Sequence, residues 1–463
     1  MKATRKLFGM LLALSLMLTL AAPASALKFI DAHGNEIELD DTLEAYAEVA
    51  LLGADDAARK GETNLGDLWT DALLWFAVSG KINDYFEEDD VTAGNDKIAV
   101  DADHVVALWN GGNLRADIAD GKFGAEELAK VLPYPNKVAV VYMTGAQLRE
   151  ALEAASQAMP YSAATAAACA SFMQVSGLKY TLDVSKRYDA GEAYGANWYM
   201  AKTLNRVTVT EVNGKAFDEA ATYAVITNNA NYNGMDSSYI FKAAAEANDK
   251  SAITDAGVRD VVWMYIDEEL ENVVRTELYG EPQGRITVTG TAVAAYRDVA
   301  LNAWYAEAVH YVTANSLMGG DGSESVFNPN GSTTRGMLVT ILYRLAGSPE
   351  VSAEGTEWYA AGRAWAMEQG ISDGTRISDT LTREEAMTML YRYAKLQGRD
   401  VSVGEDTNIL SYEDAFELSA WAIPAIQWAC GDGILGGSDG KLAGHSPMTR
   451  AEMAKVLMAY NAQ

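Results

Sequence analysis

A repeated pattern in the C-terminal third of the chain constrains its fold more than any other feature. After residue 295, a tryptophan is followed three times by a Thr-Arg dipeptide and an apolar stretch. The matching positions are Trp304 with Thr334-Arg335, Trp358 with Thr382-Arg383, and Trp421 with Thr449-Arg450. A threonine directly before apolar residues at helical spacing predicts a helix N-cap. Three copies of one small unit predict an all-α module whose repeats bury their apolar faces against each other.

The three copies differ in completeness. The first opens with Tyr296-Arg297-Asp298 and the third with Tyr412-Glu413-Asp414, whereas the second lacks an aromatic-x-Asp opening. The Thr-Arg dipeptide is followed by Glu-Glu in the second copy and by Ala-Glu in the third, but by Gly336 in the first. We expect the copies to span residues 291–348, 349–403 and 404–463, with the second degenerate.

These repeats resemble surface-layer homology (SLH) repeats, the third copy most closely. The resemblance implies a three-repeat helical bundle whose grooves bind secondary cell-wall polysaccharide or peptidoglycan. It assigns this binding to Asp298, Arg335, Arg383, Asp414 and Arg450. A guanidinium group can pair with a carboxylate of such a polymer through two parallel hydrogen bonds. The sequence leaves open the alternative that these residues only cap helices and hold them in place.

A second informative stretch, Asn110-Gly111-Gly112-Asn113-Leu114-Arg115, lies in the first part of the chain. It follows the apolar run 105–109, which predicts a buried strand, so it marks the turn that leaves this strand. Glycines allow a close approach of the backbone to a ligand or a positive φ. The flanking amide and guanidinium suit a base edge, a ribose or a carboxylate. On its own, such a stretch is also typical of an ordinary turn.

Four further motifs accompany this stretch in a fixed order. They are Glu62–Leu68 with Asp71-Ala72, Leu132–Val138, Met143–Leu148 and Phe172–Tyr180. Together with Asn110–Arg115 they resemble the C-terminal domain of the secreted 5'-nucleotidase/UDP-sugar hydrolase family, over about residues 40–290. The resemblance implies an α+β domain with a mixed sheet that recognises a nucleoside or nucleotide, and we place this domain at residues 27–290.

The resemblance also assigns ligand contacts to individual residues. Asn110 and Arg115 match the family's contacts to the base and the ribose. Tyr134 matches one of two aromatic residues that stack on the base, and Asp236 matches an acidic residue that accepts from ribose hydroxyls. The ordinary alternatives are a surface ion pair for Arg115, a half-buried loop aromatic for Tyr134 and a turn residue for Asp236.

The sequence departs from the family pattern where the second stacking aromatic should be. Ala230 stands at its place, and Tyr232 is the candidate substitute. Met235 replaces a glycine of the same motif, and an arginine expected in the helix after Asn64 is missing. A base with only one face covered loses roughly 1–3 kcal/mol of stacking.

We expect no catalytic metal centre in this chain. In the nucleotidase family that this chain resembles, a separate N-terminal domain holds two divalent metals and opens with an Asp-x-His similar to Asp31-Ala32-His33. The chain has only four histidines, and the rest of that metal set does not follow. The alternation around Asp31 predicts a hairpin over residues 28–39 instead. We therefore expect no catalytic residues, no cofactor and no phosphatase activity from this chain alone.

Residues 1–26 predict a secretory signal. Lys2, Arg5 and Lys6 precede an apolar run to Leu20, and Ala24-Ser25-Ala26 offers a cleavage site. The run is short for an uncleaved anchor, and no later segment is apolar enough to span a membrane. We expect a secreted protein at the cell wall or cell surface of a bacterium. Because the signal directly precedes the recognition domain, we expect the catalytic half to be absent rather than upstream.

The charge of the chain narrows its partners. It carries 36 Lys and Arg against 64 Asp and Glu, a net charge of −28, which argues against binding to nucleic-acid backbones. Cys169 and Cys430 lie in different expected domains and predict separate core thiols. Helices are predicted over residues 41–60, 63–76 and 258–270.

Three functional hypotheses remain from the sequence. The first is a module that captures a nucleoside or nucleotide at the cell surface or docks onto a separate catalytic chain. The second is a wall-structural protein whose nucleotidase-like domain has lost its site. The third is a hydrolase that uses an unrecognised site, which metal-dependent phosphate release lost on His33→Ala would support.

Overall fold

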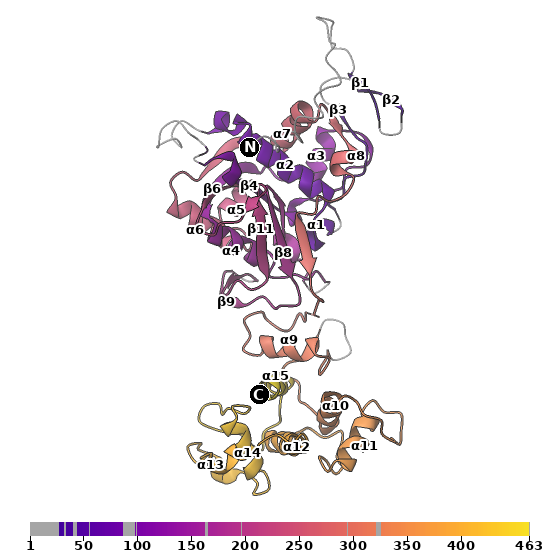
Figure 1. Ribbon diagram of the computed structural model, residues 1–463, viewed down its shortest axis with the longest axis vertical. Helices are drawn as coiled ribbons and strands as arrows, with labels where there is room; N and C mark the ends of the chain where they lie inside the picture. The colour runs from indigo at the N-terminus through magenta and orange to yellow at the C-terminus, as the bar shows by residue number, and fades with distance from the viewer. Residues whose placement is uncertain are drawn as a thin grey trace, which may run out of the picture.

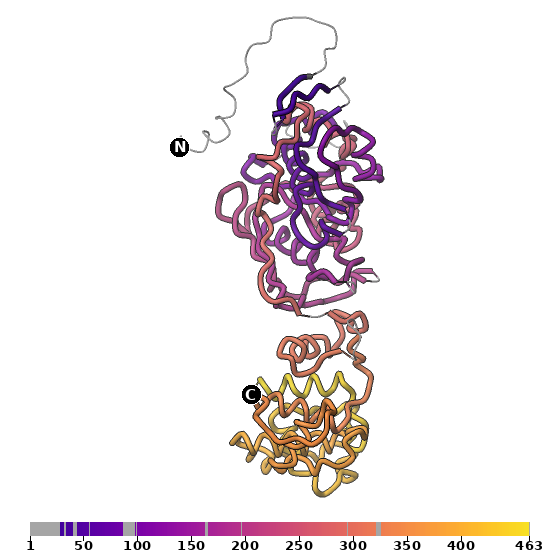
Figure 2. The backbone as a smooth tube through the Cα atoms, turned by 90° about the vertical axis from the view of Figure 1, so that its right-hand side faces the viewer, coloured from indigo at the N-terminus to yellow at the C-terminus, as the bar shows by residue number. Residues whose placement is uncertain are grey.

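The computed structural model describes residues 27–31, 34–39, 44–54, 56–86, 98, 100–162, 165–195, 197–293, 295–320 and 326–462. The expected signal segment and His33 lie outside these residues. The chain forms two lobes stacked along one long axis, a mixed-sheet domain ending near residue 289 and a helical module after it (Figure 1). A view from the side shows the same two lobes (Figure 2). No helix in the described ranges combines the length and apolar character needed to cross a bilayer.

The mixed-sheet domain is organised around a five-stranded sheet. Its strands, in the order β14-β6-β13-β4-β7, are β14 (Ala252–Gly257), β6 (Lys137–Thr144), β13 (Thr222–Asn228), β4 (Val105–Asn110) and β7 (Met173–Ser176). Strands β13 and β4 run parallel, and the other pairs are antiparallel. Every β4 side chain is buried because helices or a second sheet cover both faces. The carboxyl ends of β4 and β13 therefore meet the start of β6 at one edge of the sheet.

Two hydrophobic cores lie on the two faces of this sheet. One face packs against α2 (Asn64–Val78) and α7 (Val258–Met264). The other packs against α4 (Gly145–Ala155), α6 (Tyr239–Ala247) and a second sheet. That sheet has the order β12-β11-β8-β16, with β12 (Lys215–Ala216), β11 (Val207–Val212), β8 (Leu178–Asp183) and β16 (Ile286–Thr289). The α+β architecture with a mixed sheet is confirmed.

The predicted start of the second helix is confirmed as well. Thr63 caps α2 by accepting a hydrogen bond from Gly66 N at 3.1 Å. Shorter elements complete the domain: α3 (Ala125–Val131), α5 (Asn229–Tyr232), α8 (Thr276–Tyr279), β9 (Ala190–Ala193) and β10 (Tyr199–Ala201).

Two local predictions differ from the structure. The helix predicted over residues 41–60 is wrong, because β3 (Glu44–Ala47) pairs with β5 (Gly121–Gly124) and β15 (Val273–Val274). Of the residues described in this range, only those of α1 (Ala57–Lys60) are helical. The helix predicted over 258–270 is α7, which continues as a π-helical turn at Tyr265–Glu269. The predicted hairpin is confirmed by the antiparallel pair β1 (Leu27–Ile30) and β2 (Glu36–Leu39).

The helical module contains three helix pairs. They are α9 (Ala306–Ala314) with α10 (Arg335–Leu345), α11 (Ala360–Glu368) with α12 (Arg383–Leu396), and α14 (Ile423–Gly431) with α15 (Arg450–Asn461), and the short α13 (Val403–Asp406) precedes the last pair. The second helix of each pair begins after a capping threonine, as predicted: Thr334, Thr382 and Thr449. One continuous core fills the space between all three pairs, which confirms the all-α three-repeat bundle.

A ring of backbone hydrogen bonds closes the module. Thr333 N donates to Met448 O at 2.8 Å, Met448 N to Leu381 O at 2.9 Å, and Leu381 N to Thr333 O at 2.8 Å. These three residues occupy the same position in successive repeats, directly before the capping threonine. The degenerate second repeat thus takes an equivalent place in a closed cycle, which needs all three copies.

Candidate functional site

The carboxyl ends of β4 and β13 are joined by a buried network of amides. Asn110 Oδ1 accepts from Asn228 Nδ2 at 3.0 Å and from Asn113 Nδ2 at 3.2 Å. Asn228 in turn caps α5, because its Oδ1 accepts from Ala230 N at 2.9 Å and Asn231 N at 3.0 Å. Asn110 is only 7% exposed. This predicted ligand contact therefore lies at the expected edge, where it holds two strand ends together.

The two glycines of the motif are needed for packing within the chain. A Cβ atom on Gly111 would lie 2.0 Å from Ala58 O, and one on Gly112 would lie 2.5 Å from Ala170 Cβ. Neither glycine has a positive φ. The close backbone approach that the sequence predicts is thus made to α1 and to the segment before β7.

Arg115 and Tyr134 come together as a pair at this edge. The Arg115 guanidinium carbon lies 5.7 Å from the centroid of the Tyr134 ring. Arg115 N donates to Val131 O at 2.8 Å, which fixes the two segments side by side. Both side chains are exposed, Tyr134 by 42%. Among the described residues no carboxylate lies within ion-pair distance of Arg115, so its charge and one aromatic surface remain available to a ligand.

The loop that carries Tyr134 is fastened to α5. Asn229 Oδ1 accepts from Asn136 Nδ2 at 3.1 Å and from Lys137 N at 3.2 Å. Since Asn228 caps the same helix, α5 links the Asn110 network to the Tyr134 loop. The turn after α5 carries Asp236, so the structure connects Asn110, Arg115, Tyr134 and Asp236 through adjoining segments.

Asp236 has the properties of an unused acceptor. It is half-buried, lies in the left-handed region at φ 55°, and burial raises the pKa of its carboxyl. In the described part of the chain it has no hydrogen-bond or ion-pair partner. A desolvated carboxylate without donors is stabilised by ligand hydroxyls.

Tyr232, the candidate for the second stacking face, is engaged with the protein. Its hydroxyl donates to Ser251 O at 3.3 Å, and its ring packs against the core that contains α4 and α6. Ala230 occupies the position at which the family's second stacking aromatic is expected. Tyr134 is therefore the exposed aromatic ring of this site, with Arg115 beside it.

The described residues contain no group of three or more His, Cys, Asp or Glu side chains that could hold a metal ion. Cys169 and Cys430 are separate thiols, and burial raises the pKa of each to about 11. Neither is poised as a nucleophile near neutral pH.

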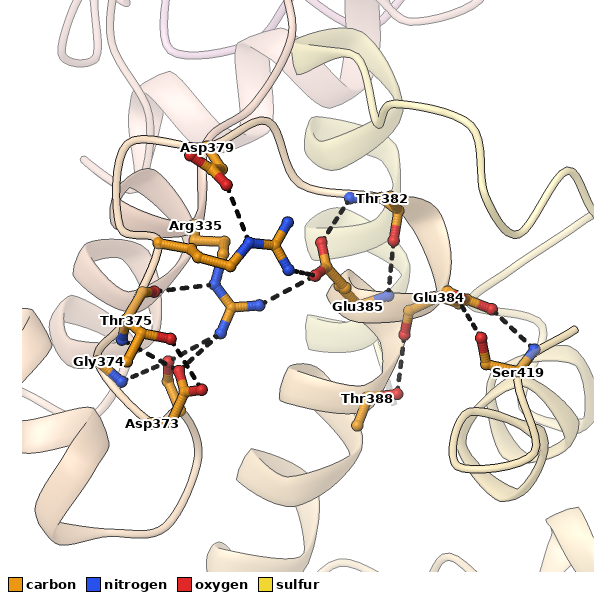
Figure 3. A network of polar contacts seen from close by, with 12 residues as sticks. Arg335, Asp373, Gly374, Thr375, Asp379, Thr382, Glu384, Glu385, Thr388 and Ser419 are labelled. Carbon is orange, nitrogen blue, oxygen red and sulfur yellow. Dashed lines mark hydrogen bonds and ion pairs between the residues drawn. The ribbon is translucent and has the colours of Figure 1, made fainter.

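The predicted wall-binding arginines connect successive repeats. Arg335, the first residue of α10, pairs with Glu385 at 3.2 Å and Asp373 at 3.1 Å and donates to Thr375 O at 3.3 Å (Figure 3). These three partners belong to the second repeat. Glu385 also accepts from the capping Thr382 N at 3.1 Å, so one carboxylate both closes its own helix and receives the neighbouring arginine.

Arg383 repeats this arrangement between the second and third copies. It pairs with Glu452 at 2.7 Å and donates to Leu442 O at 2.9 Å and Gly436 O at 3.1 Å. It is only 8% exposed. Arg450 closes the cycle onto the first repeat, where it donates to Phe327 O at 2.8 Å and lies 4.6 Å above the Phe327 ring.

The two predicted aspartates fasten loops within their own repeats. Asp298 accepts from Phe327 N at 2.9 Å and Asn328 N at 2.7 Å. Asp414 accepts from Leu442 N at 2.8 Å and Ala443 N at 2.7 Å, and these bonds hold the pKa of its carboxyl below the usual range although burial opposes them. Each loop then supplies a carbonyl to an arginine, since Phe327 O accepts from Arg450 and Leu442 O from Arg383.

Comparison with known protein families identifies both lobes. Residues 45–246 match the family described as "5'-nucleotidase, C-terminal domain". Residues 295–336 and 411–454 match the S-layer homology domain, which covers parts of the first and third repeats. The chain therefore joins a 5'-nucleotidase C-terminal domain to S-layer homology domains, which are modules of the bacterial cell surface.

Individual relatives match about half of this chain, and the matched part spans less than half the length of each of them. A trifunctional nucleotide phosphoesterase protein, YfkN of Bacillus subtilis (strain 168), is 27% identical over 226 residues, which are 48% of this chain but 13% of that protein. A 5'-nucleotidase precursor from Thermus thermophilus is 28% identical over 54% of this chain and 40% of its own, with a TM-score of 0.40. The NAD nucleotidase of Haemophilus influenzae is 15% identical, covering 53% and 38%, with a TM-score of 0.36.

Proposed function

We propose that this chain, a 5'-nucleotidase C-terminal domain fused to S-layer homology domains, captures a nucleoside or nucleotide at the bacterial cell surface. The observation that carries the proposal is the exposed pair of Arg115 and Tyr134 at the edge where β4 and β13 end. Edges where parallel strands end are frequent ligand sites because the chain turns away there and leaves a crevice.

Each group of the site has a complementary part in such a ligand. The exposed ring of Tyr134 offers a face for a base, which stacks on aromatic rings without regard to sequence. The Arg115 guanidinium, with no carboxylate beside it in the described residues, suits a phosphate or a base carbonyl. The unpartnered carboxylate of Asp236 suits the two hydroxyls of a ribose.

The helical module would hold this site at the cell wall. We propose that wall-polymer carboxylates reach the groove between the first and second repeats by replacing Asp373 at Arg335, because Asp373 is 65% exposed. Asp298, Asp414, Arg383 and Arg450 would shape the grooves by holding loops and neighbouring repeats. We propose as well that the protein is secreted, that its helical module binds a polymer of the cell wall, and that its mixed-sheet domain docks onto a separate catalytic chain.

The test is calorimetric titration of the full chain with adenosine, AMP and UDP-glucose, with and without Mn²⁺ or Zn²⁺, while phosphate release is assayed. We expect binding without turnover, weakened at least about tenfold, or about 1.4 kcal/mol, by Arg115→Ala. Lys179→Ala is the control, because Lys179 is exposed on β8 and its ion-pair partner in the described ranges is Glu211. Absence of binding by all three ligands would overturn the proposal. Phosphate release that is lost on His33→Ala would also overturn it and would show that the chain is a hydrolase.

A further inference from the structure

A cavity of about 440 Å³ lies between the two lobes. Met159, Tyr188 and Tyr199 line it from the mixed-sheet domain, and Tyr296 and Val309 line it from the first repeat. Its volume falls within the range of small-molecule sites, and such sites are frequent where two domains meet. A ligand there would contact both domains at once.

The charges along this cavity contrast with those of the whole chain. Lys186, Arg187 and Arg297 line it, whereas Asp298 is the one carboxylate among its described lining residues. Both oxygens of Asp298 already accept backbone N–H groups. His310 also lines the cavity, and burial lowers its pKa, which favours the neutral imidazole. In a chain with a net charge of −28, this is a local concentration of positive charge.

The carboxylates outside the cavity only partly offset these cations. Lys186 pairs with Asp183 at 3.4 Å on the surface. Asp189 and Glu307 act on Arg187 from a distance, and neither lies within ion-pair distance of it.

Arg187 is the group that most needs an anion. Its guanidinium donates to Leu301 O, which joins the two lobes, and in the described residues it has no carboxylate partner. Arg187 is half-buried, and this burial lowers its pKa although Asp189 and Glu307 oppose the shift. A desolvated cation without a paired anion is costly, and an anion that enters the cavity would offset this cost.

A second unsatisfied donor lies in the same wall. Gln157 is 2% exposed, and its Oε1 accepts from Tyr199 N at 3.1 Å, which fixes the orientation of the amide. Its Nε2 has no hydrogen-bond partner in the described part of the chain. Buried amide donors are nearly always paired, so this exception adds to the case for a polar ligand.

We propose that this cavity binds a small organic anion, a sugar-sized ring that carries a carboxylate or a phosphate, and that the bound anion bridges the two lobes. The cations would take the anionic group. The tyrosine rings and the aliphatic side chains would cover the ring of the ligand, which an inorganic ion would leave unused. This proposal is independent of the nucleoside site at Arg115.

The test is calorimetric titration of the full chain with glucuronate, glucose 6-phosphate, inorganic phosphate and glucose. We expect one site that takes glucuronate or glucose 6-phosphate, and the stronger of the two identifies the preferred group. Binding should weaken at least about tenfold in Arg187→Gln, or about 1.4 kcal/mol. Arg297→Gln should also weaken it, and because Arg297 is exposed this variant keeps its fold.

The control variants separate this site from the other one. Lys179→Gln removes an exposed lysine far from the cavity lining, and Arg115→Ala removes the nucleoside site, so both should bind the anion as the parent chain does. Absence of binding by both organic anions would overturn the proposal. Binding that persists in both Arg187→Gln and Arg297→Gln would also overturn it, as would equal affinity for glucose.

Discussion

Arg115 of the mixed-sheet domain and the motif arginines of the helical module have opposite surroundings. Arg115 is exposed and has an aromatic ring beside it. Arg335 and Arg383 each contact a carboxylate and a backbone carbonyl of the next repeat. The same side chain thus remains available for recognition in one lobe and connects parts of the fold in the other.

The difference follows from the carbonyl and carboxylate groups around each arginine that need a hydrogen-bond donor. Each repeat presents loop carbonyl groups and the carboxylate of its capping box to the neighbouring repeat. A guanidinium from the preceding repeat can pair with this carboxylate and donate to the carbonyls at the same time. At the sheet edge the amides of Asn110 and Asn228 already satisfy the strand ends. Arg115 is therefore available for recognition, because other groups have met the needs of the backbone around it.

Removing Arg383 should give the largest effect. Arg383→Ala removes the guanidinium that pairs with Glu452 and donates to the carbonyls of Leu442 and Gly436 at a largely buried junction. We expect the helical module to lose about 3 kcal/mol of unfolding free energy. Urea unfolding of the full chain, with hydrogen exchange of the α12 and α15 amides, measures this loss.

The control for this variant is Arg376→Ala. Arg376 also pairs with Glu385, but its side chain is 58% exposed, so the loss of stability should be far smaller than in Arg383→Ala. If Arg383→Ala were as mild as this control, the arginine would not connect the repeats, and the contrast with Arg115 would disappear.

The mixed-sheet domain also contains an arginine that joins distant parts of its fold. Arg285 pairs with Asp71 at 2.8 Å and lies 3.6 Å from Asp67. Burial raises the pKa of Asp67 to about 8, and Arg285 opposes this shift only in part. Asp67 Oδ1 also lacks a hydrogen-bond donor in the described residues.

A carboxyl whose pKa is raised in the folded state keeps its proton there and releases it on unfolding. Between the unfolded pKa near 4 and the folded value near 8, stability must therefore fall as the pH rises. We expect the mixed-sheet domain to lose stability steadily between pH 5 and pH 8 and Asp67→Asn to flatten this slope. Urea unfolding across this pH range measures it, and a slope unchanged in Asp67→Asn would assign the titration to another group.

The sequence predicted the elements that depend on local patterns. Capping at Thr63 and at the three repeat threonines, the strand at 105–109, and the hairpin follow from neighbouring residues. The helix over 41–60 was wrong because β3 is stabilised by β5 and β15, which lie far away in the chain. Pairing partners at such separations override local propensity.

The sequence assigned roles to individual residues, but it did not reveal the partners of these residues. Nothing in the spacing shows that Glu385 receives Arg335, or that Gly111 packs against Ala58. The interlobe cavity was missed entirely, because Gln157, Arg187 and His310 belong to segments without a common pattern. A run of basic residues beside tyrosine at 186–188 was the one signal that pointed to it.

The smallest expected change in stability is that of Arg115→Ala, which we compare with Asn110→Ala at the other end of the same motif. Asn110→Ala removes the acceptor for the buried Asn228 Nδ2, which should cost about 1–3 kcal/mol and loosen the start of α5. Arg115→Ala, five residues later, should change stability by less than about 0.5 kcal/mol because the side chain is exposed. Hydrogen exchange of the β4 and β13 amides in the full chain measures both. Equal losses would make Arg115 a structural residue like Arg383, whereas a stable Arg115→Ala protein that has lost its nucleotide affinity would show that this arginine serves recognition.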